Sequence, residues 1–131
     1  IGVRMVRHIQ TDEGYDSDYP FSQGVVNDGV LYTAGQIPKD AETGEVVCTT
    51  IEAQTDKTFE NLEAVLSAAG TDFEHVLKAT AFLTDMDDYE GFNRVYREWV
   101  PEPHPGRSTV AVDELAIDIK VEIEMVAAIP E

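Results

Sequence analysis

Residues 119–129 read IKVEIEMVAAI, an alternation of apolar and polar side chains that predicts a β-strand. Successive side chains of a strand point to opposite faces of its sheet, so the run separates into two sets. One set is Val121, Ile123 and Met125, and the other is Glu122, Glu124 and Val126. The strand therefore presents two neighbouring carboxylates on a single face.

Five further strands are predicted from short runs rich in apolar or β-branched residues. They cover residues 3–7, 23–26, 30–33, 76–84 and 107–112. The second and third are joined by Asn27-Asp28-Gly29, and Asp-Gly between two apolar runs predicts a β-hairpin because such residues tolerate positive φ. In the fourth, the alternation places Val76, Thr80 and Phe82 on one face.

Two helices are predicted between these strands. Thr49-x-x-Glu52 forms a capping box, and an apolar stripe then recurs at helical spacing up to Gly70. That stripe consists of Phe59, Leu62, Leu66 and Ala69. Asp87-x-x-Glu90 begins the second helix, which Pro101 and Pro103 end because proline cannot continue a helix. Its stripe consists of Phe92, Val95, Tyr96 and Trp99.

The order of these elements, β-β-β-α-β-α-β-β, indicates an α+β fold. With 131 residues the chain fits one domain over residues 1–131. Two helices can cover only one face of a sheet of about six strands, so the other face needs a partner. We therefore expect oligomerisation through that face.

The composition is strongly acidic, with 26 Asp and Glu residues against nine Lys and Arg and a net charge of −17. A nucleic acid is not expected as a partner, because its binding depends on cations that neutralise phosphates. The acids are scattered along the chain, which is typical of a surface adapted to high salt. An acidic surface for a protein partner is the alternative.

Cys48 is the only cysteine, so no internal disulfide forms and a cytoplasmic location is expected. No apolar run approaches the roughly 20 residues of a membrane helix, and residues 1–10 lack the pattern of a signal peptide, so no membrane association is expected. No metal site is expected, because the histidines share no ligand spacing with one another or with Cys48. The sequence also lacks the glycine-rich motifs that bind phosphates.

Arg107 is a candidate ligand-binding residue, since it is one of only five arginines and enters a predicted strand after Pro105-Gly106. Its planar guanidinium can hold a carboxylate through two parallel hydrogen bonds, which orients the ligand. A structural salt bridge, for example to Glu122, is the alternative. Glu122 itself is either a general base whose pKa is adjusted by burial or an ordinary solvated strand residue.

Five motifs occur together in the order and spacing of one known family. They are Phe21-Ser22-Gln23, Thr33-Ala34-Gly35-Gln36-Ile37-Pro38, Thr43-Gly44-Glu45-Val46, Pro105-Gly106-Arg107-Ser108-Thr109 and Lys120-Val121-Glu122-Ile123-Glu124. With this combination, from Pro20 to Ile129, the chain resembles the Rid family of reactive-intermediate deaminases. Its members are also called YjgF or L-PSP endoribonuclease-like proteins.

The resemblance implies a chorismate-mutase-like α+β fold of the bacillus type, with a mixed sheet and two helices on one face. It also implies a homotrimer with active sites between subunits, and hydrolysis of 2-imino or 2-enamino acids to 2-keto acids and ammonia without a cofactor. Arg107 then matches the arginine that binds the carboxylate of this small metabolite, and Glu122 the acid that handles the attacking water. The implied substrate-binding positions are Phe21, Thr33, Ala34, Gly35, Asn93 and Thr109.

Three of these positions depart from the family's pattern. Phe21 stands where the deaminases commonly carry Tyr, Ala34 where they carry Ser, and Thr109 where they often carry Cys. The first two changes remove a hydroxyl that could bind substrate or water, so a non-catalytic module that binds 2-keto acids is the alternative to an enzyme. Endoribonuclease activity or inhibition of translation, suggested by the older family name, is opposed by the net charge of −17.

Overall fold

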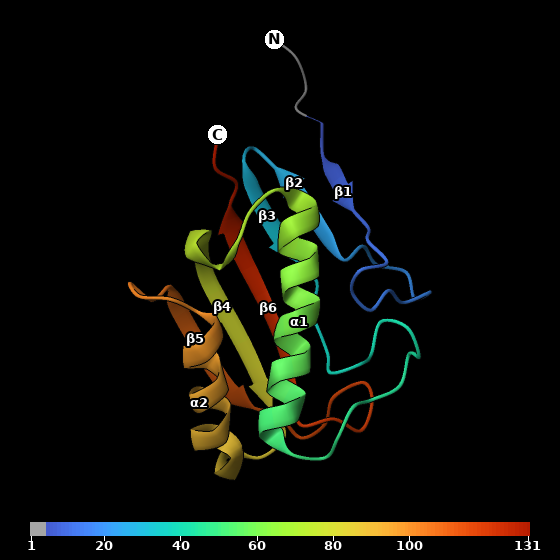
Figure 1. Ribbon diagram of the computed structural model, residues 1–131, viewed down its shortest axis with the longest axis vertical. Coiled ribbons are helices and arrows are strands. Elements are labelled where there is room, and N and C mark those ends of the chain that lie inside the picture. The colour runs from blue at the N-terminus through green and yellow to red at the C-terminus, as the bar shows by residue number, and fades with distance from the viewer. Residues whose placement is uncertain (1–4) are drawn as a thin grey trace.

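Figure 1 shows the computed structural model, which describes residues 5–131, as one mixed sheet with two helices. The six strands lie in the order β1-β2-β3-β6-β4-β5. Their bounds are β1 Arg7–Ile9, β2 Gly24–Asn27, β3 Val30–Thr33, β4 Val76–Leu83, β5 Gly106–Ala111 and β6 Val121–Ala128. β4 and β5 are parallel, and the other neighbouring pairs are antiparallel. The predicted α+β fold is therefore confirmed.

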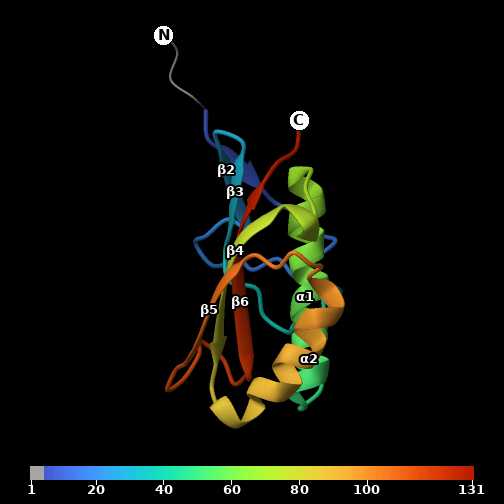
Figure 2. The ribbon, with the colours of Figure 1, turned by 90° about the vertical axis from the view of Figure 1, so that its left-hand side faces the viewer.

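The helices α1 (Ile51–Ala69) and α2 (Tyr89–Trp99) cover the same face of the sheet, and the opposite face is bare of helices in the described chain (Figure 2). The hydrophobic core lies between these helices and the sheet. Its fully buried side chains include Phe59, Leu62, Leu83, Phe92 and Ile123. Each such side chain contributes about 1.5–3 kcal/mol through burial. The predicted helix stripes and the two faces of β6 are confirmed.

β2 and β3 form the predicted hairpin. Asn27 pairs with Val30, so the turn consists of Asp28 and Gly29 alone. Their φ angles are 56° and 76°, as a two-residue hairpin turn with positive φ at both positions requires. The turn fixes the register of β3 against β2, and therefore the path of the chain beyond β3.

The predicted start of α1 is wrong by one residue. Thr50 rather than Thr49 is the N-cap, because its backbone is extended and its Oγ1 accepts a hydrogen bond from the Ala53 amide at 3.2 Å. Either of two adjacent threonines can cap the helix, but only Thr49 is followed three residues later by Glu, so the capping-box pattern selects the wrong one. Glu52 pairs with Arg94 of α2 at 2.8 Å and so ties the two helices together.

The predicted start of α2 is also wrong. A 3₁₀ turn over Met86–Asp88 precedes the helix, and Asp85 caps that turn by accepting a hydrogen bond from the Asp87 amide at 2.9 Å. The helix then begins at Tyr89 without a side-chain capping bond from Asp88. Three aspartates between residues 85 and 88 make the capping position ambiguous in the sequence.

The predicted face of β4 is wrong because the strand contains a bulge. The register against β6 shifts between Val76 and Lys78, which adds one residue to β4. Val76 is therefore buried toward the helices, while Thr80 and Phe82 project from the bare face. The buried residues beyond the bulge are Ala79, Ala81 and Leu83.

The strand expected over residues 3–7 is displaced toward the C-terminus. Residues 3 and 4 lie outside the described residues, and β1 spans Arg7–Ile9. It pairs with β2 and so forms the edge of the sheet on that side. The other predicted strands agree with the structure to within two residues at each end.

Candidate functional site

Arg107 and Glu122 lie on opposite faces of the sheet. Arg107 pairs with Ala79 of β4, whose side chain is buried beneath the helices. Glu122 pairs with Phe82 of β4, which projects from the bare face. Paired residues of neighbouring strands project to the same side, so Arg107 points toward the helices and Glu122 away from them. A salt bridge between these two residues of one chain is therefore excluded.

Aromatic side chains of α2 hold the Arg107 guanidinium in place. It donates a hydrogen bond to the Tyr89 hydroxyl at 3.0 Å. Its central carbon lies 4.6 Å from the ring centroid of Tyr96 and 5.2 Å from that of Phe92, within the range of cation–π attraction. Tyr96 packs in turn against Phe59 of α1 in an edge-on arrangement, with 5.6 Å between centroids. The guanidinium is thus positioned by the core itself.

The hollow around Arg107, which we call the arginine hollow, has a volume of about 310 Å³. It is lined by Tyr89, Asn93, Tyr96, Arg97, His104, Pro105 and Arg107. Among residues 5–131, no carboxylate lies within salt-bridge distance of Arg107. In a chain with a net charge of −17, such an arginine is available to an anionic ligand.

The Tyr96 hydroxyl is buried beside Arg107 and has no hydrogen-bond partner among the described residues. Burial raises the pKa of Tyr96, and the neighbouring Arg107 cation offsets part of that rise. The phenol therefore stays protonated at neutral pH and can donate a hydrogen bond. An unpaired buried hydroxyl costs about 1–3 kcal/mol, which an acceptor entering the arginine hollow would offset.

The Glu122 carboxylate lies directly against Gly35. A Cβ atom at position 35 would overlap that carboxylate, so only glycine leaves room for it there. Burial raises the pKa of Glu122, and repulsion from Glu124 on the same face raises it further. No group in residues 5–131 donates a hydrogen bond to this carboxylate. A half-buried carboxylate with a raised pKa and without donors is suited to accept a proton.

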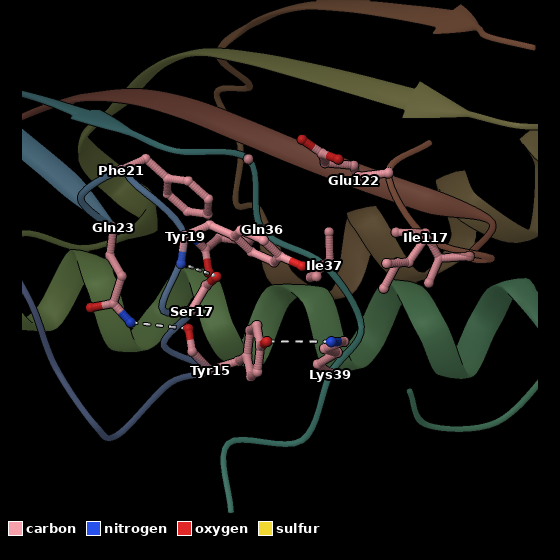
Figure 3. A pocket seen from close by; sticks show the side chains of 13 residues that line it. Tyr15, Ser17, Tyr19, Phe21, Gln23, Gln36, Ile37, Lys39, Ile117 and Glu122 are labelled. Carbon is pink, nitrogen blue, oxygen red and sulfur yellow. Dashed lines mark hydrogen bonds between the residues drawn. The ribbon is translucent and has the colours of Figure 1, made fainter. Parts of the chain in front are cut away.

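A cavity of about 180 Å³, which we call the glutamate cavity, adjoins Glu122 (Figure 3). Its lining residues are Tyr15, Ser17, Tyr19, Phe21, Gln23, Gly35, Gln36, Ile37, Lys39, Ala116, Ile117, Ile119 and Glu122. Glu122 is the one carboxylate of this set and Lys39 the one cation. The Lys39 ammonium donates a hydrogen bond to the Tyr15 hydroxyl at 3.3 Å and lies 4.9 Å from the centroid of that ring.

Two buried amides hold the walls of the glutamate cavity, and the sequence reasoning missed both. The Asn61 side chain of α1 accepts a hydrogen bond from the Tyr15 amide at 3.0 Å. It also donates to the carbonyls of Ile37 and Lys39 at 2.9 and 2.8 Å. The Gln23 side chain donates to the Tyr15 carbonyl at 3.0 Å. An asparagine inside a long helix is a weak helix former, and that was the available sequence signal.

Three of the predicted substrate-binding residues line the two hollows. Asn93 lies in the arginine hollow, one turn of α2 before Tyr96. Phe21 and Gly35 lie in the glutamate cavity. Phe21 therefore offers no hydroxyl to that cavity, which Tyr15 and Tyr19 also line. The roles of these residues in substrate binding stay predictions.

Three other predicted residues line neither hollow. The Thr33 hydroxyl accepts a hydrogen bond from the Met125 amide at 2.9 Å, so it serves the sheet. The Ala34 amide donates to the Gln23 carbonyl at 2.8 Å and so fixes the segment that leads to Gly35. Thr109 lies on the same face of β5 as Arg107, and its buried hydroxyl has no partner among the described residues.

The described residues contain no group of three His, Cys, Asp or Glu side chains that could hold a metal ion. Cys48 is exposed, and its thiol is free. Within residues 5–131, neither helix has the length and apolar composition needed to cross a membrane.

Comparison with known proteins relates the chain to one family. It matches the family model described as Endoribonuclease L-PSP over residues 13–129. A RutC family protein of Pyrococcus horikoshii is 43% identical over 108 residues, which span 82% of this chain and 86% of that protein. The solved structure of RidA from the Antarctic bacterium Psychrobacter sp. is 35% identical with a TM-score of 0.90, covering 94% of this chain and 99% of that one.

The solved structure of E. coli TdcF with bound serine is similar as well. It is 33% identical with a TM-score of 0.87, covering 93% of this chain and 98% of that one. Sequence and fold agree over nearly the whole length of both proteins. The chain therefore belongs to the YjgF/Rid family, the family of the endoribonuclease L-PSP model.

Proposed function

We propose that the protein hydrolyses reactive 2-imino or 2-enamino acids to 2-keto acids and ammonia. The observation that carries this proposal is that, within residues 5–131, neither candidate group forms a salt bridge. Arg107 has no carboxylate partner among residues 5–131, and Glu122 is a half-buried carboxylate with a raised pKa. A binding cation and a proton acceptor are what the hydrolysis of a small imino acid requires. Serine bound to the relative TdcF has the same 2-nitrogen carboxylate skeleton.

A complete site would need two copies of the chain, because Arg107 and Glu122 of one chain point to opposite faces of the sheet. We propose a homotrimer in which the arginine hollow of one subunit lies next to the glutamate cavity of its neighbour. The bare face supports this assembly, since Tyr32 and Val110 there are 51% and 44% exposed. Apolar side chains on a face without helices favour association with another copy.

The chemistry follows from the two groups. Arg107 binds the substrate carboxylate bidentately, and the carbon of the protonated imine then lies near Glu122. Water adds to that carbon and gives a proton to Glu122. The product of this addition is a tetrahedral carbinolamine. The proton moves on to the nitrogen, the C–N bond breaks, and the keto acid and ammonium leave. Orientation supplies much of the rate, because a protonated imine is already a strong electrophile.

A non-catalytic module that binds 2-keto acids is the second candidate. Phe21 and Ala34 favour it, because neither side chain offers a hydroxyl to a substrate or a water. Phe21 lines the glutamate cavity directly, so the change falls on the wall beside Glu122. The same arginine would then bind the carboxylate of a keto acid that is released unchanged.

Two substitutions separate the candidates. Arg107→Ala removes the carboxylate anchor, so binding of pyruvate measured by calorimetry weakens by about 2–5 kcal/mol and imine hydrolysis is nearly abolished. Glu122→Gln leaves keto-acid binding intact but lowers kcat by about 10²–10⁴-fold. Arg94→Ala is the matched control on α2, since Arg94 pairs with Glu52 away from the arginine hollow. Imine hydrolysis that is unchanged in Arg107→Ala would refute the proposed mechanism. Binding without ammonia release from any imine would establish the binding module.

A further inference from the structure

The glutamate cavity extends well beyond Glu122 and is mostly apolar. Phe21, Ile37, Ile117 and Ile119 contribute aliphatic or aromatic surface to it, and its volume is about 180 Å³. An engineered apolar cavity of about 150 Å³ in another protein is large enough to bind benzene. Space of this size exceeds what the methyl group of a small imino acid would fill.

The charged groups of the glutamate cavity disfavour a charged occupant. Glu122 is the only carboxylate among its described lining residues and repels a second acid. Lys39 is the only cation in the part of the lining that the structure describes, and its ammonium is already engaged by the ring and the hydroxyl of Tyr15. Figure 3 shows Glu122 reaching the cavity from β6, with Ile37 and Ile117 among the side chains around the remaining space. A neutral apolar group therefore fits the cavity best.

The walls of this cavity are fixed by the hydrogen bonds of Asn61 and Gln23. From its place on α1, Asn61 hydrogen-bonds both the loop at Tyr15 and the segment that contains Ile37 and Lys39. Both amide side chains are nearly fully buried, at 3% and 2% exposure. The cavity is therefore preformed, and a ligand group that enters it does not have to order the loop.

We infer that the glutamate cavity binds the side chain of the substrate and selects a bulky apolar one, either branched aliphatic or aromatic. This inference rests on the proposed function, because it places the imine carbon at Glu122. A substituent on the next carbon then enters the space lined by Phe21, Ile37 and Ile117. The preferred substrates are the 2-imino acids that correspond to leucine or phenylalanine.

A substrate panel tests the inference. The 2-imino acids of alanine, leucine, phenylalanine and glutamate are generated in situ, and keto-acid formation is measured above the spontaneous rate. We expect kcat/KM for the leucine or phenylalanine imine to exceed that for alanine by about tenfold or more, as hydrophobic pockets discriminate. A preference for the alanine imine overturns the inference. A preference for the glutamate imine that disappears in Lys39→Met overturns it as well.

Two substitutions at Ile117 change the cavity in opposite directions. Ile117→Phe fills it, so the ratio of kcat/KM for the phenylalanine imine to kcat/KM for the alanine imine falls by about tenfold or more. Ile117→Ala enlarges it and shifts the preference toward the phenylalanine imine. Leu115→Phe is the matched control, since Leu115 lies on the same loop but does not line the glutamate cavity. Thermal melts identify a variant that fails to fold, and the remaining Ile117 variant then decides.

Binding of keto acids distinguishes this inference from the proposed function. Calorimetry with phenylpyruvate and pyruvate measures the selectivity of the cavity without any chemical step. Tighter binding of phenylpyruvate that Ile117→Phe abolishes, without hydrolysis of any imine, supports the cavity and refutes the enzyme. Hydrolysis that is independent of side-chain size and of Ile117 supports the enzyme and refutes the cavity.

Discussion

The arginine hollow and the glutamate cavity differ in nearly every physical property. The arginine hollow is open, lies on the helix side of the edge strand β5, and is framed by aromatic rings of α2. The glutamate cavity lies where the bare face meets the loops, and it is apolar and held by buried amides. In the proposed reaction, the first supplies charge and orientation, while the second supplies desolvation and a proton acceptor. Neither could act on an imino acid alone, which is why we place the reaction between two copies.

Placing a methyl group at Gly35 would break the glutamate cavity while leaving the arginine hollow intact. A Cβ there would overlap the Glu122 carboxylate, so Gly35→Ala displaces the proposed base. A displacement of about 1 Å costs on the order of 10²-fold in rate, so kcat falls by that factor while pyruvate binding through Arg107 is retained. Gly106→Ala is the control, since a Cβ there meets only ordinary contacts, the nearest at 3.6 Å. Unchanged turnover in Gly35→Ala would remove Glu122 from the mechanism.

Removing the Asn61 amide would loosen only the glutamate cavity. Asn61→Ala leaves the Tyr15 amide and the Ile37 and Lys39 carbonyls without their partner, which should lower the free energy of unfolding by about 1–3 kcal/mol. Chemical denaturation measures this change, and the selectivity for bulky side chains should fall with it. Glu63→Ala on the exposed side of α1 is the control. Wild-type selectivity in Asn61→Ala would show that the cavity walls do not depend on this residue.

The smallest expected effect is a pH-dependent gain in stability in Glu122→Gln. Because burial and Glu124 raise the folded pKa of Glu122 above 4.5, the folded state binds more protons than the unfolded state in that range. Its favourable contribution is thus present below the unfolded pKa and is lost as pH rises through the folded pKa. Glu122→Gln should therefore raise the melting temperature at pH 7 but not at pH 4. Equal shifts at both pH values would show that Glu122 does not titrate as inferred.

The elements of the fold could be predicted because they depend on local periodicity. The alternation in β6 and the stripes of α1 and α2 follow from which residues face one core. The predicted helix starts were wrong where neighbouring residues of the same type can each act as the N-cap, as Thr49 and Thr50 can. The prediction of which β4 residues share a face was wrong, because a single bulge between Val76 and Lys78 reverses the alternation. Nothing in the local sequence marks that bulge.

The sequence names candidate residues for the site, but it does not give their geometry. Arg107 and Glu122 were identified by residue type and family motif, yet their opposite faces follow from pairing with Ala79 and Phe82 across the sheet. The glutamate cavity depends on contacts between segments far apart in sequence, such as Asn61 with Tyr15. Long-range pairing of this kind leaves no periodic signal in a single sequence.

Mixed assembly of two inactive variants tests most directly whether Arg107 and Glu122 act from different chains. Arg107→Ala and Glu122→Gln are unfolded together in denaturant, refolded as a mixture, and assayed for imine hydrolysis. If each site combines residues of two neighbouring chains, an equal mixture restores about a quarter of wild-type activity, because random assembly pairs the two intact residues in that share of sites. Activity no greater than the mean of the separately refolded variants would contradict a site shared between subunits.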